Sequence, residues 1–405
     1  MKKNVLRAVF LTAGILSAVS LASCNDRDEM DKNMDSQRSI SFENISEVKD
    51  FVQSGSFSGT TTPIILPGQS VSFTFSAGKA QHLMLATMYG ASNDWFFASA
   101  QPGIRLFDDS GAAITGDVSS EIRLWDNGTK DNVSGDPESN PVATVPNVDA
   151  SQLMHVSLAY NSVSSQFTVT ITNTSGGTAH ETPFSPGVWA VSNYNGTQLL
   201  NPAPFFTPGS LSNPEITDIA EMGNINKLKT KLDTETGIMT GLSQALVVVY
   251  NGDNPIYELG QKDSGNGLKD IAQFGNTETL SAYLKTLPNV KGVYVAGSAP
   301  IAPGQKVTAN FTSDSGDKIA YVTMFGFSND WFYANEQDIS SETRGDVTSR
   351  TALFDSGTGI DQYPGAGNNQ ALFGGTPETE DVVISKVGDT FPVPSVDRIV
   401  KVTIN

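Results

Sequence analysis

The chain contains one block of sequence twice. Residues 67–101 read PGQSVSFTFSAGKAQHLMLATMYGASNDWFFASAQ, and residues 303–337 read PGQKVTANFTSDSGDKIAYVTMFGFSNDWFYANEQ. The copies align without a gap, and identity is densest at T-M-x-G-x-S-N-D-W-F. A duplication within 405 residues predicts two related folding units, each large enough to bury its own core. A repeated unit also favours a binding or structural role over a catalytic one.

Hydrophobic alternation indicates a chain built mainly of strands. Apolar and polar residues alternate with a period of two over 71–75, 167–171 and 400–404, which is typical of half-buried strands. The continuously apolar run ALVVVY at 245–250 predicts a strand buried on both faces. Charged residues make up only 17%, which suits short strands joined by many polar turns. The predicted fold class is all-β.

Helix signals are confined to the middle of the chain. Asn213-Pro214 can begin a helix with proline at its first position, and Gly223-Asn224 ends it. A second short helix then carries Leu228 and Leu232. The same pattern returns: IAEMGN at 219–224 is echoed by IAQFGN at 271–276, with Leu280 and Leu284 in the places of the two leucines. The helical pair is therefore a second, smaller repeat.

The predicted units are 38–161 and 166–405. Residues 153–161 match the C-terminal 399–405 in pattern, and 162–165 reads as a short polar linker between units. The second unit is longer because it then holds both helical pairs. A rival partition returns 166–240, with the first helical pair, to the first unit.

The N-terminus predicts export and lipid attachment. Lys2, Lys3 and Arg7 precede an apolar stretch that is too short to span a membrane, and Leu21-Ala22-Ser23-Cys24 follows. Residues 1–23 are therefore interpreted as a signal peptide. Because Cys24 is the only cysteine and stands at the cleavage point, the segment resembles a bacterial lipoprotein signal. The alternative is an ordinary signal peptide with an incidental cysteine.

Residues 24–37 are predicted to form an acidic tether. The stretch begins NDRDEMDK after the cysteine and resembles the surface-export signal of bacterial lipoproteins, although a plain solvated linker is the alternative. The expected location is the outer membrane, exposed at the cell surface and held through the lipid alone. Without its first 23 residues the chain has 22 basic against 43 acidic side chains, a formal charge of −21. This charge excludes nucleic acid as an expected partner and is compatible with Ca²⁺.

A second shared motif follows each Asp-Trp-Phe block. It reads GDVSSEIRLWDNGTKDN at 116–132 and GDVTSRTALFDSGTGIDQYPGAGNNQ at 345–370. Here the chain resembles the spondin N-terminal domain family, whose bacterial members carry S-N-D-W-F, G-D-V-T, L-W-D-A-G-T-E-x-N and P-G-x-G-x-x-Q in that order. The resemblance covers most of 166–405 and about 67–132; the first copy lacks the front half and the P-G-x-G-x-x-Q run. It implies two antiparallel C2-like β-sandwich domains in tandem, the second with short helical insertions.

The resemblance also implies extracellular adhesion and a Ca²⁺ site, which the family has in its animal members. Ca²⁺ takes six to eight oxygen ligands, and loops at one end of a sandwich can gather aspartates from distant positions. The second copy offers Asp330, Asp346, Asp355 and Asp361, and the weaker counterparts in the first copy are Asp94, Asp117, Asp126 and Asn132.

Two observations set limits on this metal hypothesis. Asp94 and Asp330 can instead orient a turn by accepting hydrogen bonds from nearby N–H groups, with the adjacent Trp95 and Trp331 in the core. Where the family has an acidic residue four positions after the D-x-G-T aspartate, this chain has Lys130 in one copy and Gly359 in the other. A lysine would repel a cation, so the second copy is the better candidate.

Motifs for catalysis are missing from the sequence. His82, His155 and His180 are scattered, and there is no H-E-x-x-H, G-x-S-x-G or P-loop. The predicted function is a non-catalytic, surface-anchored binding or adhesion lipoprotein, Ca²⁺-dependent, with an extracellular protein or glycan as ligand. One alternative is a carbohydrate-active hydrolase, because its carboxylate pair leaves no local signature. Another is a structural subunit of an outer-membrane assembly.

Overall fold

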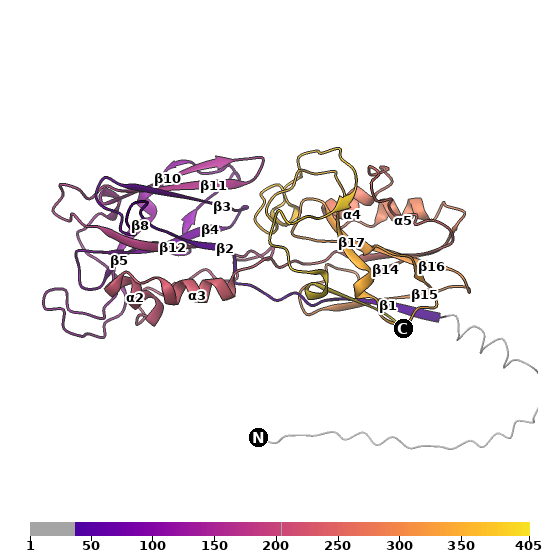
Figure 1. Cartoon of the computed structure of the whole chain (residues 1–405), viewed down its shortest axis with the longest axis horizontal. Coiled ribbons are helices and arrows are strands. Elements are labelled where there is room, and N and C mark those ends of the chain that lie inside the picture. Colours follow the sequence, from indigo (N-terminus) through magenta and orange to yellow (C-terminus); the bar gives the residue numbers. More distant parts are fainter. Residues whose placement is uncertain (1–36, 204) are drawn as a thin grey trace, which may run out of the picture.

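The computed structural model describes residues 37–203 and 205–405, which form two β-rich bodies lying side by side (Figure 1). The named strands form four sheets in which every strand pair is antiparallel, so the mostly-β prediction is confirmed. The predicted signal peptide, Cys24 and nearly all of the tether lie outside the described residues. Within them, helices are too short or too polar to cross a membrane.

Unit one comprises residues 51–235 and contains two sheets. Its four-stranded sheet has the order β3 (Ser70–Ser76), β11 (Gln166–Asn173), β10 (Met154–Asn161) and β7 (Gly116–Asp117). Its seven-stranded sheet has the order β2 (Phe51–Phe57), β12 (Phe184–Ser192), β4 (His82–Tyr89), β5 (Trp95–Ser99), β8 (Ile122–Asp126) and β9 (Ala143–Thr144), with β6 (Ile104–Arg105) paired to β4.

Unit two repeats this plan with residues 245–405 and one strand from the N-terminus. Its four-stranded sheet has the order β15 (Lys306–Thr312), β1 (Gln37–Asn44), β22 (Val400–Ile404) and β19 (Gly345–Asp346). Its seven-stranded sheet has the order β14 (Val290–Ala296), β13 (Ala245–Tyr250), β16 (Lys318–Met324), β17 (Trp331–Asn335), β20 (Thr351–Asp355) and β21 (Ser385–Lys386), with β18 (Ile339–Ser340) paired to β16.

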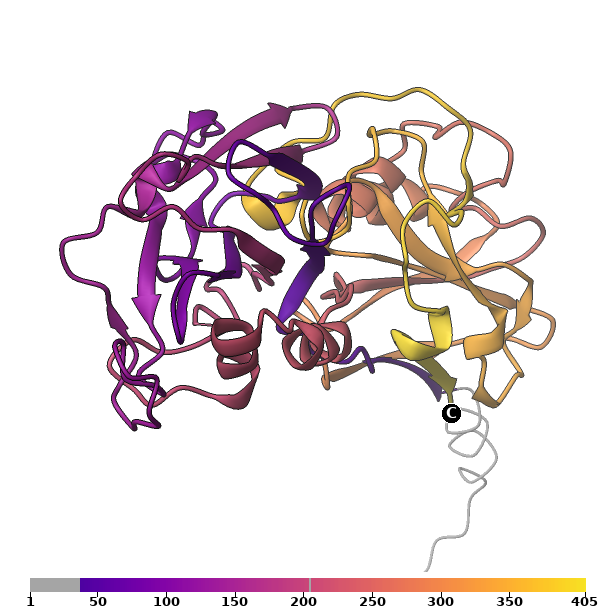
Figure 2. The ribbon, with the colours of Figure 1, turned by 60° about the vertical axis from the view of Figure 1, so that its left-hand side comes forward.

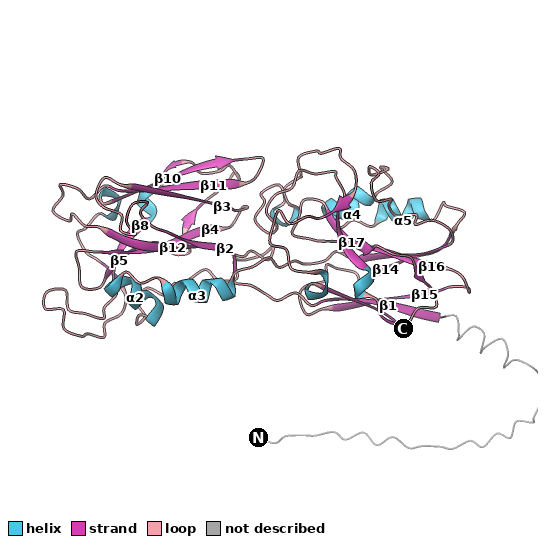
Figure 3. Ribbon diagram, viewed as in Figure 1, coloured by secondary structure: helices cyan, strands magenta, loops and turns pink. Residues whose placement is uncertain are grey.

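One helical pair covers the outer face of the larger sheet in each unit. In unit one, α2 (Pro214–Met222) and α3 (Asn226–Glu235) lie below the sheet in the view of Figure 3; in unit two, α4 (Leu268–Phe274) and α5 (Glu278–Leu284) lie above theirs. Asn213 caps α2 as its side chain accepts a bond from Ile216 N, and Gly223 ends it in the left-handed region at φ 64°. Short 3₁₀ turns complete the elements: η1 (Ser119–Glu121), η2 (Ala150–Gln152), η3 (Thr348–Arg350), η4 (Ala371–Phe373) and η5 (Val396–Arg398).

Apolar faces of the two sheets meet in each unit. In unit one, one cluster joins Phe75 and Phe167 of the smaller sheet to Leu85 and Phe97 of the larger sheet, and the outer cluster lies under α2 and α3. Unit two has an equivalent pair of clusters. All six residues of β13 are buried, as the apolar run at 245–250 predicts.

The predicted boundaries are corrected by the strand pairing. Residues 162–165 turn within a hairpin, because β10 and β11 pair from Met154↔Asn173 to Asn161↔Gln166. β12 pairs with β2 and β4, and α2 and α3 pack on the same sheet, so 166–235 belongs to unit one as the rival partition proposes. Unit two is completed by β1, which pairs with β15 and β22.

Unit one is thus inserted between the first and second strands of unit two. β1 occupies in unit two the place that β11 occupies in unit one, in the same register: Gln37 lies opposite Thr312, and Gln166 lies opposite Ser76. The side-chain contacts repeat as well. Asn44 Nδ2 donates to Ile301 O at 2.9 Å, and Asn173 Nδ2 donates to Ile65 O at 3.0 Å. The two units have the same spatial arrangement but a permuted chain order.

The P-G-A-G-N-N-Q segment, which the first copy lacks, joins the two units. Figure 2 shows this gold-coloured part of unit two against the indigo and purple strands of unit one. This segment, with Gln362 just before it, contacts the β10–β11 turn and the start of β4 through side-chain amides and backbone groups. These bonds are Gln362 Nε2 to Val163 O at 2.9 Å, Asn368 N to Ser165 Oγ at 2.9 Å, Lys79 N to Asn368 Oδ1 at 3.1 Å and Gln81 Nε2 to Gly365 O at 3.0 Å.

Candidate functional site

The repeated Ser-Asn-Asp-Trp-Phe motif forms the same turn in both units. In unit two, Ser328 Oγ donates to Phe325 O at 2.7 Å and accepts from Trp331 N at 3.0 Å. Ser92 makes the equivalent bonds to Tyr89 O and from Trp95 N. The turn directs the aspartate side chain inward, and both Asp94 and Asp330 have no exposed surface.

Asp330 holds the Asp-Ser-Gly-Thr loop that follows β20. Its Oδ2 accepts four hydrogen bonds: from Ser356 Oγ at 2.7 Å, Thr358 N at 2.7 Å, Thr358 Oγ1 at 3.1 Å and Gly359 N at 2.9 Å. Burial raises the pKa of Asp330, and these donors oppose the rise because they favour the ionised form. The turn-orienting role considered from the sequence is therefore one real role of this side chain.

Asp94 holds the matching loop of unit one with fewer donors. Its Oδ2 accepts from Thr129 N at 2.8 Å, Lys130 N at 3.0 Å and Thr129 Oγ1 at 3.2 Å. Burial raises its pKa too, with hydrogen bonds from the two loop N–H groups in opposition. The shared bonds show that both aspartates fix the loop conformation.

Two more of the predicted carboxylates gather around Asp330 in unit two. Burial, with the nearby charge of Asp330, raises the pKa of Asp355 to about 7. Burial, with the charges of Asp355 and Asp330, raises the pKa of Asp361 to about 8. Glu380 adds to both shifts. The cluster therefore retains protons at neutral pH, since like charges at close range in a poorly solvated site disfavour full ionisation.

Two carboxylate oxygens in this cluster are buried without a hydrogen bond of normal geometry. Within residues 37–203 and 205–405, neither Asp330 Oδ1 nor Asp361 Oδ1 accepts a hydrogen bond of normal geometry. Trp331 nevertheless lies close enough to Asp361 to lower the pKa of that carboxyl group, and Asp330 lies close enough to Asp355 to share a proton with it. Such oxygens are the ligand type that Ca²⁺ prefers. In the same described part of the chain, no three His, Cys, Asp or Glu side chains are arranged as a ready-made metal site. A cation here would need main-chain carbonyls or water among its remaining ligands.

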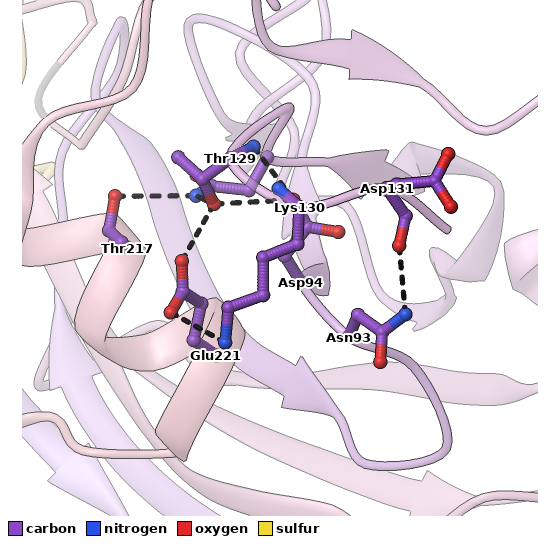
Figure 4. Close-up of polar contacts among 8 residues, drawn as sticks. Asn93, Asp94, Thr129, Lys130, Asp131, Thr217 and Glu221 are labelled. Atoms are coloured by element: carbon purple, nitrogen blue, oxygen red, sulfur yellow. Dashed lines mark hydrogen bonds and ion pairs between the residues drawn. The ribbon is translucent and has the colours of Figure 1, made fainter. Parts of the chain in front are cut away.

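Unit one has a lysine at the corresponding position of the loop. Lys130 Nζ forms an ion pair with Glu221 Oε2 at 2.9 Å, and Thr129 Oγ1 donates to Glu221 Oε1 at 2.9 Å (Figure 4). Both side chains of the ion pair are partly buried, with 33% and 18% of their surfaces exposed. Asn132, in the place of Asp361, donates Nδ2 to Asp126 Oδ2 at 2.6 Å. The Lys130 ammonium is thus held by Glu221, and a neutral amide is bonded to Asp126.

Asp117 and Asp346 do not join either cluster. They lie exposed on β7 and β19 in the four-stranded sheets, where each begins a 3₁₀ turn. Asp117 Oδ1 accepts from Ser119 N at 2.8 Å, and Asp346 Oδ1 accepts from Thr348 N at 2.8 Å. Hydrogen bonds from the hydroxyl groups of Ser119 and Thr348, together with these N–H bonds, lower the pKa of both carboxyl groups. Asp346, predicted as a metal ligand, is instead a turn residue, because the G-D-V-T motif belongs to the other sheet.

The tryptophans follow the core interpretation, more fully in unit two. Trp331 is 1% exposed and packs edge-on against Phe325 with ring centroids 5.8 Å apart, whereas Trp95 is half-buried beside Tyr89.

Sequence reasoning missed Glu221, the partner of Lys130 on α2. A signal was available: Glu221 aligns with Gln273 in the IAEMGN/IAQFGN repeat, and this difference in charge parallels the difference between Lys130 and Gly359.

The helix residue at this position bonds the loop in both units, with a different charge. Gln273 Nε2 donates to Thr358 O at 3.2 Å and to Thr358 Oγ1 at 3.0 Å, whereas Glu221 accepts from Thr129 and pairs with Lys130. Unit two consequently has three clustered aspartates that no lysine of the same loop neutralises.

Neither the models of known protein families nor the curated proteins give a match to this chain.

Proposed function

We propose that this chain is a surface-anchored, non-catalytic binding or adhesion lipoprotein whose second unit takes up Ca²⁺. In this proposal the units are two C2-like β-sandwiches of the spondin N-terminal type. The motif order in both copies supports it, as do paired sheets that share one core in each unit. The observation that carries the Ca²⁺ part is the grouping of Asp330, Asp355 and Asp361, where burial and the neighbouring carboxylates raise the pKa of Asp355 to about 7 and that of Asp361 to about 8.

The donor set of unit two is suited to a hard divalent cation. Asp330 Oδ1 and Asp361 Oδ1 would supply two carboxylate oxygens, and Asp355 would add negative charge from the start of the same loop. A bound Ca²⁺ would replace the protons that the cluster otherwise retains. It would also hold the loop between Asp355 and Asp361 beside the segment that joins the units.

Thermal unfolding of the soluble chain 25–405 with EDTA and with 5 mM Ca²⁺ tests this site. A ligand bound only by the folded state stabilises it, and affinities of about 10⁻⁴–10⁻³ M, usual for extracellular modules, correspond to about 1–2 kcal/mol at this concentration. Ca²⁺ should raise the melting temperature, and Asp361→Asn should remove the rise. An equal rise in Asp361→Asn, or none in the parent chain, would exclude the site.

A glycan and matrix-protein binding array, with and without Ca²⁺, tests the adhesion role. We expect binding to an extracellular protein or glycan that decreases on chelation and in Asp361→Asn, while Asp346→Asn, outside the cluster, binds as the parent does. If a ligand bound equally to the parent chain with Ca²⁺, to the parent chain without Ca²⁺ and to both variants, its binding would not depend on the cation site. Turnover of array glycans by the parent chain would contradict the non-catalytic assignment.

Surface anchoring rests on the sequence before the described residues. In the full-length protein, Cys24→Ser should abolish lipid attachment and release the chain from the outer-membrane fraction. Added protease should digest the anchored parent protein on intact cells. Protection of the parent protein until the outer membrane is opened would place it on the periplasmic face.

A hydrolase is the second candidate, because of the same two pKa values. A carboxyl group that titrates near neutrality meets the requirement for a general acid, and a neighbouring carboxylate could act as base or nucleophile. Under this hypothesis Asp361→Asn would abolish cleavage of a polysaccharide that the parent chain degrades. Absence of cleavage by the parent across polysaccharide classes would leave the binding role.

A further inference from the structure

A cleft of about 680 Å³ lies where the two units meet. Its floor is the end of unit two at which β13 and β16 meet α4, and its lining includes Ser243, Gly275 and Met324. The cleft does not include the carboxylate cluster. A volume of this size is within the usual range for small-molecule sites, about 300–1,000 Å³.

The floor of the cleft is a repeated feature of the fold. A Cβ on Gly275 would meet Ser243 Cβ at 2.9 Å and lie 3.9 Å from Met324 Sδ; on Gly223 it would meet Ser185 Cβ at 2.7 Å and lie 3.6 Å from Met88 Sδ. Both glycines end a helix in the left-handed region, at φ 68° and 64°. The floor therefore belongs to the repeated unit, and the contact between units adds the remaining walls.

One wall comes from unit one and from the residues that directly follow the joining segment. Asn195 and Leu200 of unit one face the cleft together with Ala371 and Leu372. The wall is fixed by packing, because Tyr194 stacks on Phe373 with ring centroids 5.7 Å apart. The linker before unit one adds Val48, which is 60% exposed.

Another part of the lining offers few main-chain donors to a peptide. It is formed by 298–303, where Pro300 and Pro303 have no N–H group. Ile301 N already donates to Leu242 O at 2.7 Å, and Ala302 N donates to Gln305 Oε1 at 3.1 Å. A peptide that binds by adding a strand needs such groups, so this part of the lining favours a small ligand.

The chemistry of the lining is neutral and mostly apolar. Among the described residues that form it there is no charged side chain, although the chain as a whole has a formal charge of −18. Phe274 in the lining is 49% exposed, and the lining residues Leu242 and Met324 are buried. Apolar surface left in a concave site of this size is typical of ligand binding.

We propose that the cleft between the units binds an uncharged, predominantly apolar small molecule. The ligand would contact the Met324 and Phe274 side of unit two and the Leu200 and Leu372 side together. Binding would therefore add contacts across the joint between the units. This site is separate from the proposed Ca²⁺ site, so chelation should leave it unchanged.

Fluorescence titration with Nile red, a neutral apolar dye, tests the proposal on the soluble chain 25–405. Gly241 lines the cleft, and a Cβ added there has no heavy atom closer than Ile301 O at 3.9 Å. Gly241→Leu should fill the space and weaken dye binding at least tenfold. The matched control is Gly388→Leu, at an exposed glycine whose added Cβ meets nothing within 4 Å.

Phe274→Ala provides a second variant that leaves the core intact. Removing this half-exposed ring should weaken binding several-fold, whereas Met222→Ala, at the equivalent place in unit one and 65% exposed, should have no effect. Unchanged dye affinity in both cleft variants, or equal losses in the controls, would overturn the proposal. Selection of apolar peptides that compete for the cleft while neutral small molecules do not bind would overturn the assigned ligand class.

Discussion

The two carboxylate sites differ in how the same loop is electrically balanced. Asp94 and Asp330 fix the loop with equivalent hydrogen bonds. In unit one, Lys130 and Asn132 bring an ammonium group and an amide, and Glu221 on α2 pairs with the lysine. In unit two, Gly359, Asp361 and Gln273 stand in those places, and the pKa of Asp361 rises to about 8. The duplicated scaffold thus tolerates both a loop lysine paired with a helix glutamate and a loop that has no lysine.

The largest expected effect tests what the sites share. Asp330→Ala would leave buried N–H and O–H donors of the loop without an acceptor and should lower the free energy of unfolding by about 3 kcal/mol. Asp94→Ala should have a similar but smaller effect on unit one, because the two loop N–H donors are equivalent but the hydroxyl bond of Ser356 has no counterpart there. Chemical denaturation, followed by fluorescence of the tryptophan beside each aspartate, measures both. A loss below about 1 kcal/mol in either unit would show that the loop is held by other contacts.

The second prediction concerns the ion pair of unit one. Lys130→Met leaves Glu221, 18% exposed, without its partner and should lower the free energy of unfolding by about 2 kcal/mol. Lys130→Met with Glu221→Gln should recover at least half of that loss. The control is Gln273→Met in unit two, which removes only neutral hydrogen bonds to Thr358 and should lower stability by about 1 kcal/mol. Additive effects of the two substitutions in unit one would mean that the pair is not coupled.

A transplant tests whether three positions account for the difference between the sites. The variant Lys130→Gly, Glu221→Gln and Asn132→Asp gives unit one the residues of unit two. In an Asp361→Asn background, 5 mM Ca²⁺ should then stabilise the chain by about 1 kcal/mol where the background alone shows no response. Melting curves with Ca²⁺ and with EDTA measure this. If the background itself still responds to Ca²⁺, the cation is bound outside the cluster.

Stability of the metal-free chain should depend on pH through unit two. The folded-state pKa values of Asp355 and Asp361, about 7 and about 8, lie above their ordinary value of 3.8, so the folded chain binds these protons more tightly than the unfolded chain. The resulting stabilisation is complete below about pH 4 and is lost as the pH rises through 7 and 8. Asp361→Asn should gain about 1 kcal/mol at pH 8.5, or about 2–4 °C, but not at pH 4. An equal gain at both pH values would assign the effect to packing.

The smallest effect is expected at the two aspartates outside the clusters. Asp117→Asn and Asp346→Asn each weaken acceptance from the first turn of a 3₁₀ segment on the exposed edge of a sheet. Each should change the melting temperature by less than about 2 °C and leave the Ca²⁺ response intact. Loss of the Ca²⁺ response in Asp346→Asn would bring this residue back into the site.

The local structure and half of the site could be predicted from the sequence. Period-two alternation located β3, β11 and β22, and Asn213-Pro214 with Gly223 located α2. Asp330, Asp355 and Asp361 were identified because the two motifs that contain them recur in order. Glu221 was not, since its pairing with Lys130 crosses 91 positions of sequence and depends on how α2 packs.

What the sequence by itself determined is the pair of repeats, the type of each main element and the residues that differ between the two loops. These depend on local periodicity, turn chemistry and side-chain identity. Only the tertiary structure decided that β1 completes unit two, that β11 stays with unit one and that Asp346 lies apart from the cluster. β1 and β11 are both half-buried strands with the same terminal asparagine contact, so either pattern fits either sheet. The choice between them is made by long-range pairing and shared burial, which local sequence does not encode.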